Sequence, residues 1–355
     1  MDEGEAILNN ESLNKRNLSI DLLKFLAISF VIFTHLFPSD FRKVLLFPFH
    51  IDMAVPIFMI ITGYNNYKSC KARNLDSVRE WFSKKNIVSK FKRICIPFFV
   101  LIAIELIINV FVRDMGFLST VKSIVKESGL GPGGYYFTVL IQVLFIFPFL
   151  YLNLDKKPCS TIVFILIFCL IYEIIVKYLG IIPPKVYRII GIRYFPTVMV
   201  GMLFAKYEKS IKMREAVIAL FAGALFIVCM NYTQYKPLIF SQWITTAFPA
   251  SLYAFFFVFV ACNYVKINSR IIRSIITLCG QASYHIFIAQ MLYFYYIHSI
   301  LWNILAIKTD ALLRVILFWI FCFIACMTLG IAFYALDELI LHKRNVIKNI
   351  FWEND

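Results

Sequence analysis

Residues 17–38 read NLSIDLLKFLAISFVIFTHLFP, an apolar stretch that carries the ionisable side chains Asp21, Lys24 and His35. On a helix with about 100° per residue, Lys24 and His35 share one face, because their spacing returns the second to within about 20° of the first. The imidazole then lies roughly 16 Å further along the helix axis, and Asp21 lies about 40° to the other side of it. Since imidazole titrates near neutral pH, His35 suits the removal of a proton from a hydroxyl group.

Each of these three side chains also has a structural interpretation. Asp21 and Lys24 are about one helical turn apart near the start of the stretch, where an ion pair and a snorkelling lysine account for both. For His35, the alternative to a general base is a neutral ring hydrogen-bonded to a neighbouring helix. Ionisable groups inside membrane helices usually face the bundle interior or a water-filled cavity, which favours a function for this face.

The composition is that of a membrane protein. The chain has 355 residues, 61% of them hydrophobic and 16% charged, and a soluble protein of this size has too little interior for so much apolar surface. The net charge of +15 falls in short basic runs between apolar segments, which is typical of membrane topology and not of nucleic-acid binding. The nine cysteines show no metal-ligand spacing, so we expect a lipid bilayer as partner, no metal and no nucleic acid.

Apolar runs of about twenty residues predict an all-α polytopic membrane protein with about ten transmembrane helices, since that length crosses a ~30 Å bilayer core. If both termini are cytoplasmic, 23 of the 36 basic residues fall on the inner side, as the positive-inside rule requires. We therefore expect a cytoplasmic tail at 1–16, one membrane domain at 17–340 and a cytoplasmic tail at 341–355, in a bacterial cytoplasmic membrane. The ninth run is long enough to contain a break. The runs are 20–38, 48–66, 94–112, 135–153, 160–179, 193–206, 216–233, 243–264, 275–300 and 311–335.

Single polar side chains interrupt several of these runs. Hydrogen bonds between helices are the first interpretation for each of them. Glu105 is also a candidate for orienting a cavity, because an acid inside the membrane is costly. His285, next to Tyr284, is assigned no role. The other interrupting residues are Gln142, Glu173, Ser283 and Tyr284.

Five segments occur in order along most of the chain: SIDLLKFLAISFVIFTHL at 19–36, AVPIFMIITGY at 54–64, KFKRICIPFF at 90–99, RYFPTVMVGMLFA at 193–205 and GQASYHIFIAQMLYF at 280–294. Together they resemble the acyltransferase 3 family of integral membrane acyltransferases, many of which O-acetylate cell-surface polysaccharides or sugars. Each segment alone is a weak match, because apolar helices look alike. Five in sequence, with the expected topology, are a more specific one.

The resemblance implies an O-acyltransferase that uses acetyl-CoA as donor. The family's first-helix histidine is taken as the catalytic base and matches His35. Its first-helix arginine matches Lys24, and its basic pair before the third helix matches Lys90 and Arg93. Lysine at two of these positions keeps the charge but lacks the bidentate fork of arginine. Gln290 stands where many members have a histidine, so it is assigned no proton chemistry.

Residues near these motifs complete the expected donor site. On the predicted inner side, Lys90 and Arg93 would bind the phosphates of acetyl-CoA beside Lys24. Three consecutive residues of the second motif are expected to contact the cofactor or the oxyanion that develops during the reaction. The alternative interpretation is that they only allow close packing of two helices. These residues are Thr62, Gly63 and Tyr64.

The predicted outer side would contain the acceptor site, bordered by the segment 125–138. Its candidate residues are Tyr136, Arg188, Arg193 and Glu105, although an interfacial aromatic belt also explains the tyrosine. The expected partners are a glycan or other hydroxyl acceptor and polysaccharide-synthesis machinery. The alternative function is a multi-span transporter or exporter of a polar solute or saccharide without covalent chemistry, which usually shows paired repeats. A protein that kept the fold but lost activity is a third option.

Overall fold

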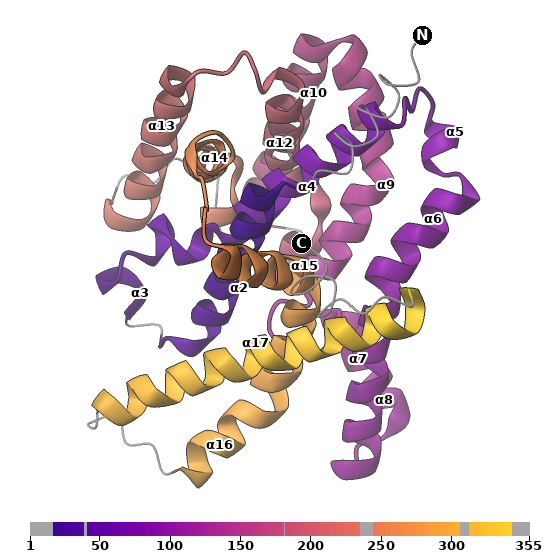
Figure 1. Ribbon diagram of the computed structural model, residues 1–355, viewed down its shortest axis with the longest axis vertical. Coiled ribbons are helices and arrows are strands. Elements are labelled where there is room, and N and C mark those ends of the chain that lie inside the picture. Colours follow the sequence, from indigo (N-terminus) through magenta and orange to yellow (C-terminus); the bar gives the residue numbers. More distant parts are fainter. Residues whose placement is uncertain (1–16, 39–40, 181, 235–243, 306–311, 343–355) are drawn as a thin grey trace.

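The computed structural model describes residues 17–38, 41–180, 182–234, 244–305 and 312–342, which form helices joined by loops (Figure 1). Eight helices in this part of the chain are long and apolar enough to cross a membrane, which confirms an all-α multi-span protein. The tail 1–16 and most of the tail 341–355 lie outside the described residues, and the cytoplasmic side of both termini stays a prediction. The eight are Leu18–Leu36 (α2), Phe47–Ala72, Lys84–Val112, Tyr135–Lys156 (α9), Pro158–Leu179 (α10), Met213–Tyr232 (α13), Arg270–Ile304 and Leu313–Leu341 (within α17, Leu312–His342).

Two of the ten expected spans are shorter than a bilayer requires. They correspond to α12, Phe195–Tyr207, and α14, Phe248–Tyr264, with 13 and 17 residues. A 13-residue helix rises only about 20 Å, so α12 alone does not cross a ~30 Å core. Most of α12 is buried, so it packs inside the bundle, and the described residues contain eight helices long and apolar enough to span where ten spans were expected.

Local interactions determine where α2 begins and ends. The Asn17 side chain accepts a hydrogen bond from the Ser19 N–H at 3.0 Å, which caps α2. Asp21 lies in the first turn, where the helix dipole favours negative charge. The helix ends at Leu36, because Pro38 drives the preceding residue into an extended conformation.

Two of the long helices contain π-helical turns. The expected break in the ninth run is such a turn at Tyr293–Ile297, between α15, Arg270–Leu292, and α16, His298–Ile304. The helix Lys84–Val112 has two more, on either side of α7, Ile96–Ile107. Such turns are frequent near functional sites because they re-aim the side chains around them.

The helices α4, Ala54–Ala72, and α12 approach each other at two glycines. Gly63 lies against the backbone carbonyl of Val198, and Gly201 lies against that of Ile60. A Cβ atom at either position would overlap the backbone of the facing helix. Small residues thus allow a close crossing, as is common between membrane helices.

Replacing Gly201 by alanine is expected to destabilise the protein by about 1–3 kcal/mol, because the new methyl group meets a backbone that cannot rotate away. Thermal unfolding in lipid nanodiscs would show this as a lower midpoint. Gly116→Ala is the control, since a Cβ there meets only the Ser119 hydroxyl, at 3.3 Å. Equal midpoints for both variants would mean that α4 and α12 separate without cost.

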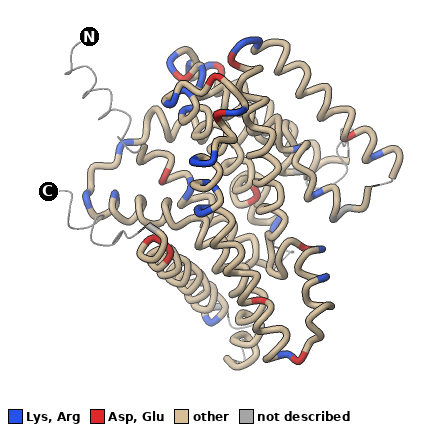
Figure 2. Tube along the Cα trace, turned by 90° about the vertical axis from the view of Figure 1, so that its right-hand side faces the viewer, with Lys and Arg blue, Asp and Glu red and all other residues tan. Residues whose placement is uncertain are grey.

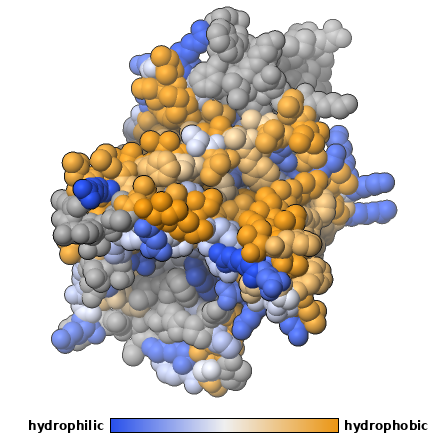
Figure 3. Space-filling model, turned by 90° about the horizontal axis from the view of Figure 1, so that it is seen from below, coloured by the Kyte–Doolittle hydropathy of each residue, from blue (hydrophilic) through white to orange (hydrophobic). Residues whose placement is uncertain are grey.

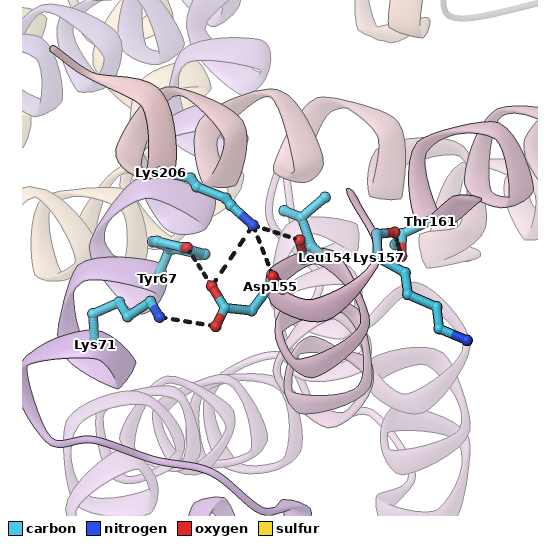
Figure 4. Close-up of polar contacts among 7 residues, drawn as sticks. All are labelled: Tyr67, Lys71, Leu154, Asp155, Lys157, Thr161 and Lys206. Carbon is cyan, nitrogen blue, oxygen red and sulfur yellow. Dashed lines mark hydrogen bonds and ion pairs between the residues drawn. The ribbon is translucent and has the colours of Figure 1, made fainter. Parts of the chain in front are cut away.

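A polar cluster joins α9 to α4 and α12 (Figure 4). Near the C-terminus of α9, Asp155 accepts hydrogen bonds from the Tyr67 hydroxyl at 2.9 Å and the Lys71 ammonium at 2.8 Å, both on α4. Lys206 of α12 donates to the backbone carbonyls of Leu154 and Asp155, each at 2.9 Å. The cluster therefore joins one end of α9 to α4 and α12, away from the first turn of α9.

The surface separates lipid-facing from polar regions. Large apolar side chains are exposed on many helices, and Figure 3 shows broad hydrophobic areas on the face seen from below. Lysines and arginines gather at the upper end and in the middle of the bundle in Figure 2, with long uncharged stretches of helix between them. Exposed apolar surface on this scale is typical of contact with membrane lipid.

Candidate active site

A cavity of about 1530 Å³ lies among α2, α4, α9, α15 and α17, and also borders α6, Lys84–Lys90. The residues that line it come from segments far apart in the sequence, so the fold gathers them into one space. Candidates from both the predicted donor side and the predicted acceptor side are among them. The sequence-predicted residues on its wall are Lys24, His35, Thr62, Lys90, Arg93, Tyr136 and Arg188.

His35 lies in the last turn of α2, on the wall of the cavity. Its half-buried ring packs against Phe294 of the π-helical turn, with 5.6 Å between ring centroids. The guanidinium groups of Arg42 and Arg188 are close enough to act on it electrostatically. The imidazole therefore stands where a reacting hydroxyl would have both a base and positive charge beside it.

Lys24 lines the same cavity as His35, which agrees with their predicted common face. Its ammonium lies 3.9 Å from the buried carboxylate of Asp21, one turn earlier. Gly280 of α15 packs directly on Asp21, so the acid sits at a tight helix contact. The ion pair expected as the structural interpretation is present, and it holds a lysine that also borders the cavity.

Lys90 and Arg93 form a basic corner of the cavity at the π-helical turn Phe91–Cys95. The buried Lys90 Nζ lies 2.7 Å from the centroid of the Trp81 ring and has no hydrogen-bond partner in the described chain. Arg73, which also lines the cavity and is hydrogen-bonded to Asn86 at 2.6 Å, adds positive charge near both. Several cations in one corner favour the binding of a ligand with more than one phosphate.

Thr62 and Tyr136 are neighbours on the cavity wall. The Thr62 hydroxyl donates to the Phe58 carbonyl at 2.8 Å and also interacts with the Tyr136 side chain. The Tyr136 ring packs between Phe58 and Phe287, at centroid distances of 5.9 and 5.4 Å. This aromatic wall offers the apolar surface on which a sugar ring or a thioester would lie.

Gly63 and Tyr64 do not belong to the described lining of the cavity. Gly63 faces α12, and the Tyr64 hydroxyl donates to Glu208 at 2.7 Å, beside the Lys68–Glu208 ion pair. Successive helical residues point about 100° apart, so only Thr62 of this segment faces the cavity. Helix packing, the alternative interpretation, accounts for the other two residues.

Arg193 is fully buried away from the cavity. Its guanidinium lies 4.3 Å from the ring centroid of Tyr187 and interacts electrostatically with Glu173 of α10. The Tyr187 hydroxyl donates to Glu173 at 2.6 Å, and burial raises the pKa of Tyr187, so this hydroxyl stays protonated. These contacts assign Arg193 to a buried polar cluster, and the cavity gives no support for direct substrate contact.

Arg188, in contrast, lies in the cavity on a segment held by hydrogen bonds. Its guanidinium lies 3.8 Å from the ring centroid of Tyr135, at the start of α9. Gln142 donates to the Ile189 carbonyl at 2.8 Å and accepts from the Gly191 N–H at 2.9 Å. Gln142 is thus an interhelical hydrogen-bonding residue, as expected, and it fixes the backbone beside this arginine.

Two ion pairs on the cavity wall were not foreseen. His285 of α15 lies 3.2 Å from Asp337 of α17, both buried, and Arg42 lies 3.0 Å from Asp52. The only signal for the first was an acid two residues after the last apolar run. A carboxylate beside an imidazole fixes the orientation and tautomer of the ring, so His285 is the second histidine of this cavity with a defined position.

The arrangement has cations and a base in one space. Lys24 and His35 lie along one helix, roughly 16 Å apart on its axis. A long ligand with an anionic head could bind its charges at the basic corner and present its other end to the imidazole. That geometry suits group transfer between a phosphate-bearing donor and a hydroxyl.

Comparison with known proteins agrees with this description. A family model described as an acyltransferase domain matches residues 17–337, a region that extends from α2 into α17. No curated protein and no solved structure gives a significant match. Because the matched region covers most of the chain, the protein belongs to the acyltransferase 3 family and is a multi-pass membrane acyltransferase.

Proposed function

We propose that this protein transfers an acetyl group from cytoplasmic acetyl-CoA to a hydroxyl of a cell-surface polysaccharide or sugar, with His35 as general base. The observation that carries the proposal is the single cavity that contains Lys24, Lys90 and Arg93 as well as His35. Acetyl-CoA has phosphates at one end and a thioester at the other. Its phosphates suit the basic corner, and its extended arm separates the thioester from those charges, as Lys24 and His35 are separated by roughly 16 Å along α2.

In the proposed reaction, His35 removes the proton from the acceptor hydroxyl while the oxygen forms a bond to the thioester carbonyl carbon. The carbonyl electrons move onto oxygen, and the Tyr136 hydroxyl and the Arg188 guanidinium are available to stabilise that negative charge. Collapse of the tetrahedral species breaks the C–S bond. The departing thiolate takes the proton from His35, which leaves an ester, a thiol and a neutral imidazole.

The proposal is tested with purified full-length protein in nanodiscs, radiolabelled acetyl-CoA and a panel of glycans. We expect label on a glycan as an alkali-labile ester. The transporter alternative predicts no labelled glycan with any member of the panel, together with uptake of an unmodified glycan by proteoliposomes. That second pattern would exclude the acyl-transfer proposal.

Replacing both Lys90 and Arg93 by glutamine is expected to raise the KM for acetyl-CoA about 10–100-fold, with a smaller change in kcat. A hydrogen bond to a charged group contributes about 1.5–3 kcal/mol and one between neutral groups about 0.5–1.5 kcal/mol, and glutamine still donates. Exchanging both charged donors for amides therefore loses about 2–3 kcal/mol of donor binding, before and during the reaction. The measurement is initial transfer rate against donor concentration.

The matched control is replacement of Lys84 and Lys85 by glutamine in the same segment, because both are exposed and neither is part of the described cavity wall. We expect that variant to keep the KM of the wild type. A similar rise of KM in both variants would mean that general positive charge, and not the basic corner, attracts the donor.

A further inference from the structure

The loop 128–134, SGLGPGG, is packed tightly against α15. It joins α8, Phe117–Glu127, to α9 and follows a path that includes φ of +98° at Gly133. A Cβ at Gly131 would overlap the backbone of Met291, and a Cβ at Gly133 would lie 2.9 Å from the Phe287 ring. Glycine is therefore required for the loop to lie this close to the helix.

Glu105 of α7 holds this loop from one side. Its carboxylate is fully buried, and one oxygen accepts a hydrogen bond from the Leu130 N–H at 2.9 Å. The Gly131 N–H is a second backbone donor to the same side chain. A buried carboxylate requires such donors, and these backbone N–H groups supply them to one of its oxygens, whereas Oε2 has no hydrogen-bond partner within the described chain.

Gln290 of α15 holds the loop from the other side. Its side-chain amide is fully buried and donates to the Pro132 carbonyl at 3.0 Å. The Ser128 and Thr138 hydroxyls lie 2.7 Å apart and join the loop to the first turn of α9. The loop is thus attached at three points, to α7, α15 and α9, and the last two of these line the cavity.

The loop leads directly into the acceptor side of the cavity. Gly133 lines it, and Tyr135 and Tyr136 follow as the first residues of α9 on the same wall. Arg188 stacks on Tyr135 and acts electrostatically on His35. A shift of the loop would therefore move the aromatic wall and the guanidinium beside the base.

We propose that Glu105 and Gln290 are positioning residues, which hold the loop 128–134 so that Tyr135 and Tyr136 form the surface that receives the acceptor's sugar ring. Neither side chain touches the cavity, so both act through the loop. The acceptor part of this inference rests on the proposed function. The inference that the loop controls the cavity wall does not rest on the proposed function, and it is measured separately.

The test uses full-length Glu105→Ala and Gln290→Leu in nanodiscs, with Glu105→Gln as the conservative variant that keeps an acceptor oxygen. Hydrogen exchange of the peptide that contains 128–137 should become about tenfold faster in the first two variants, because their loop amides open more readily. Modification of His35 by diethyl pyrocarbonate, followed by mass spectrometry, should accelerate with it. Glu105→Gln should remain close to wild type in both measurements.

Kinetics supply the test of the acceptor role. With the glycan labelled by the wild type, the first two variants should raise the acceptor KM about tenfold and leave the KM for acetyl-CoA within about twofold. Asp155→Asn is the control for a general loss of stability, since Asp155 bonds α4 at the polar cluster of Figure 4 and not the loop. It should change neither His35 modification nor the acceptor KM.

The possible outcomes are distinct. Faster exchange of the loop with unchanged His35 modification would overturn the positioning role, and unchanged exchange would show that these side chains do not hold the loop. If His35 modification changes as expected but the wild type labels no glycan, the loop does control the cavity wall and the proposed acetyl transfer fails.

Discussion

Replacing His35 by alanine is expected to lower the rate of acetyl transfer about 10²–10⁴-fold, the usual contribution of a general base. The imidazole lines the cavity that also contains the basic corner, and without it a hydroxyl must attack the thioester while still protonated. The measurement is the initial rate of glycan labelling at saturating acetyl-CoA. The KM for the donor should change little, because the proposed phosphate site lies at the basic corner and not at His35.

His298→Phe is the matched control for this prediction. His298 packs among aromatic rings such as Phe294 and Trp302 and does not belong to the described cavity wall, so phenylalanine preserves its packing. We expect it to retain activity within about twofold. Glycan labelling by His35→Ala at the wild-type rate would remove His35 from the role of base, whatever the behaviour of the control.

The first helix was predictable because its signals are local. Asn17 and Pro38 set its ends, and the spacing of Lys24 and His35 set their common face. Both residues do line one cavity. Helical periodicity alone predicts that two residues share a helix face. It does not predict which residues of other segments pack against that face.

The roles of the residues in the segment Thr62–Tyr64 could not be predicted from local sequence. Its composition fits both a cofactor contact and a helix contact, and only the rotation of α4 against α12 decides between them. Because Gly63 must meet the carbonyl of Val198, Thr62 turns toward the cavity and Tyr64 toward Glu208. That rotation is set by packing across more than a hundred residues of sequence.

The buried contact between His285 and Asp337 was the least predictable part of the site. Asp337 lies 52 residues after His285, and nothing in either helix alone indicates that they meet. The interpretation of α12 as a span, and not its length, was wrong for a related reason. An apolar sequence favours burial but does not distinguish burial in lipid from burial in protein, so a short interior helix looks like a span.

Arg193→Met is expected to destabilise the protein by about 1–3 kcal/mol, because it removes a buried guanidinium that stacks on Tyr187 and acts electrostatically on Glu173. Arg193 is fully buried, and its loss leaves the buried carboxylate of Glu173 without that cation. Unfolding in nanodiscs should show a clear fall in midpoint, whereas Arg214→Met, at a side chain that is 83% exposed, should show almost none.

A second substitution separates the charge from the packing. Adding Glu173→Gln to Arg193→Met removes the unpaired carboxylate, and glutamine can still accept the hydrogen bond from Tyr187. The double variant should therefore recover part of the lost stability, by the usual coupling of neighbouring residues. No recovery would mean that the stacking of Arg193 on Tyr187 holds the segment.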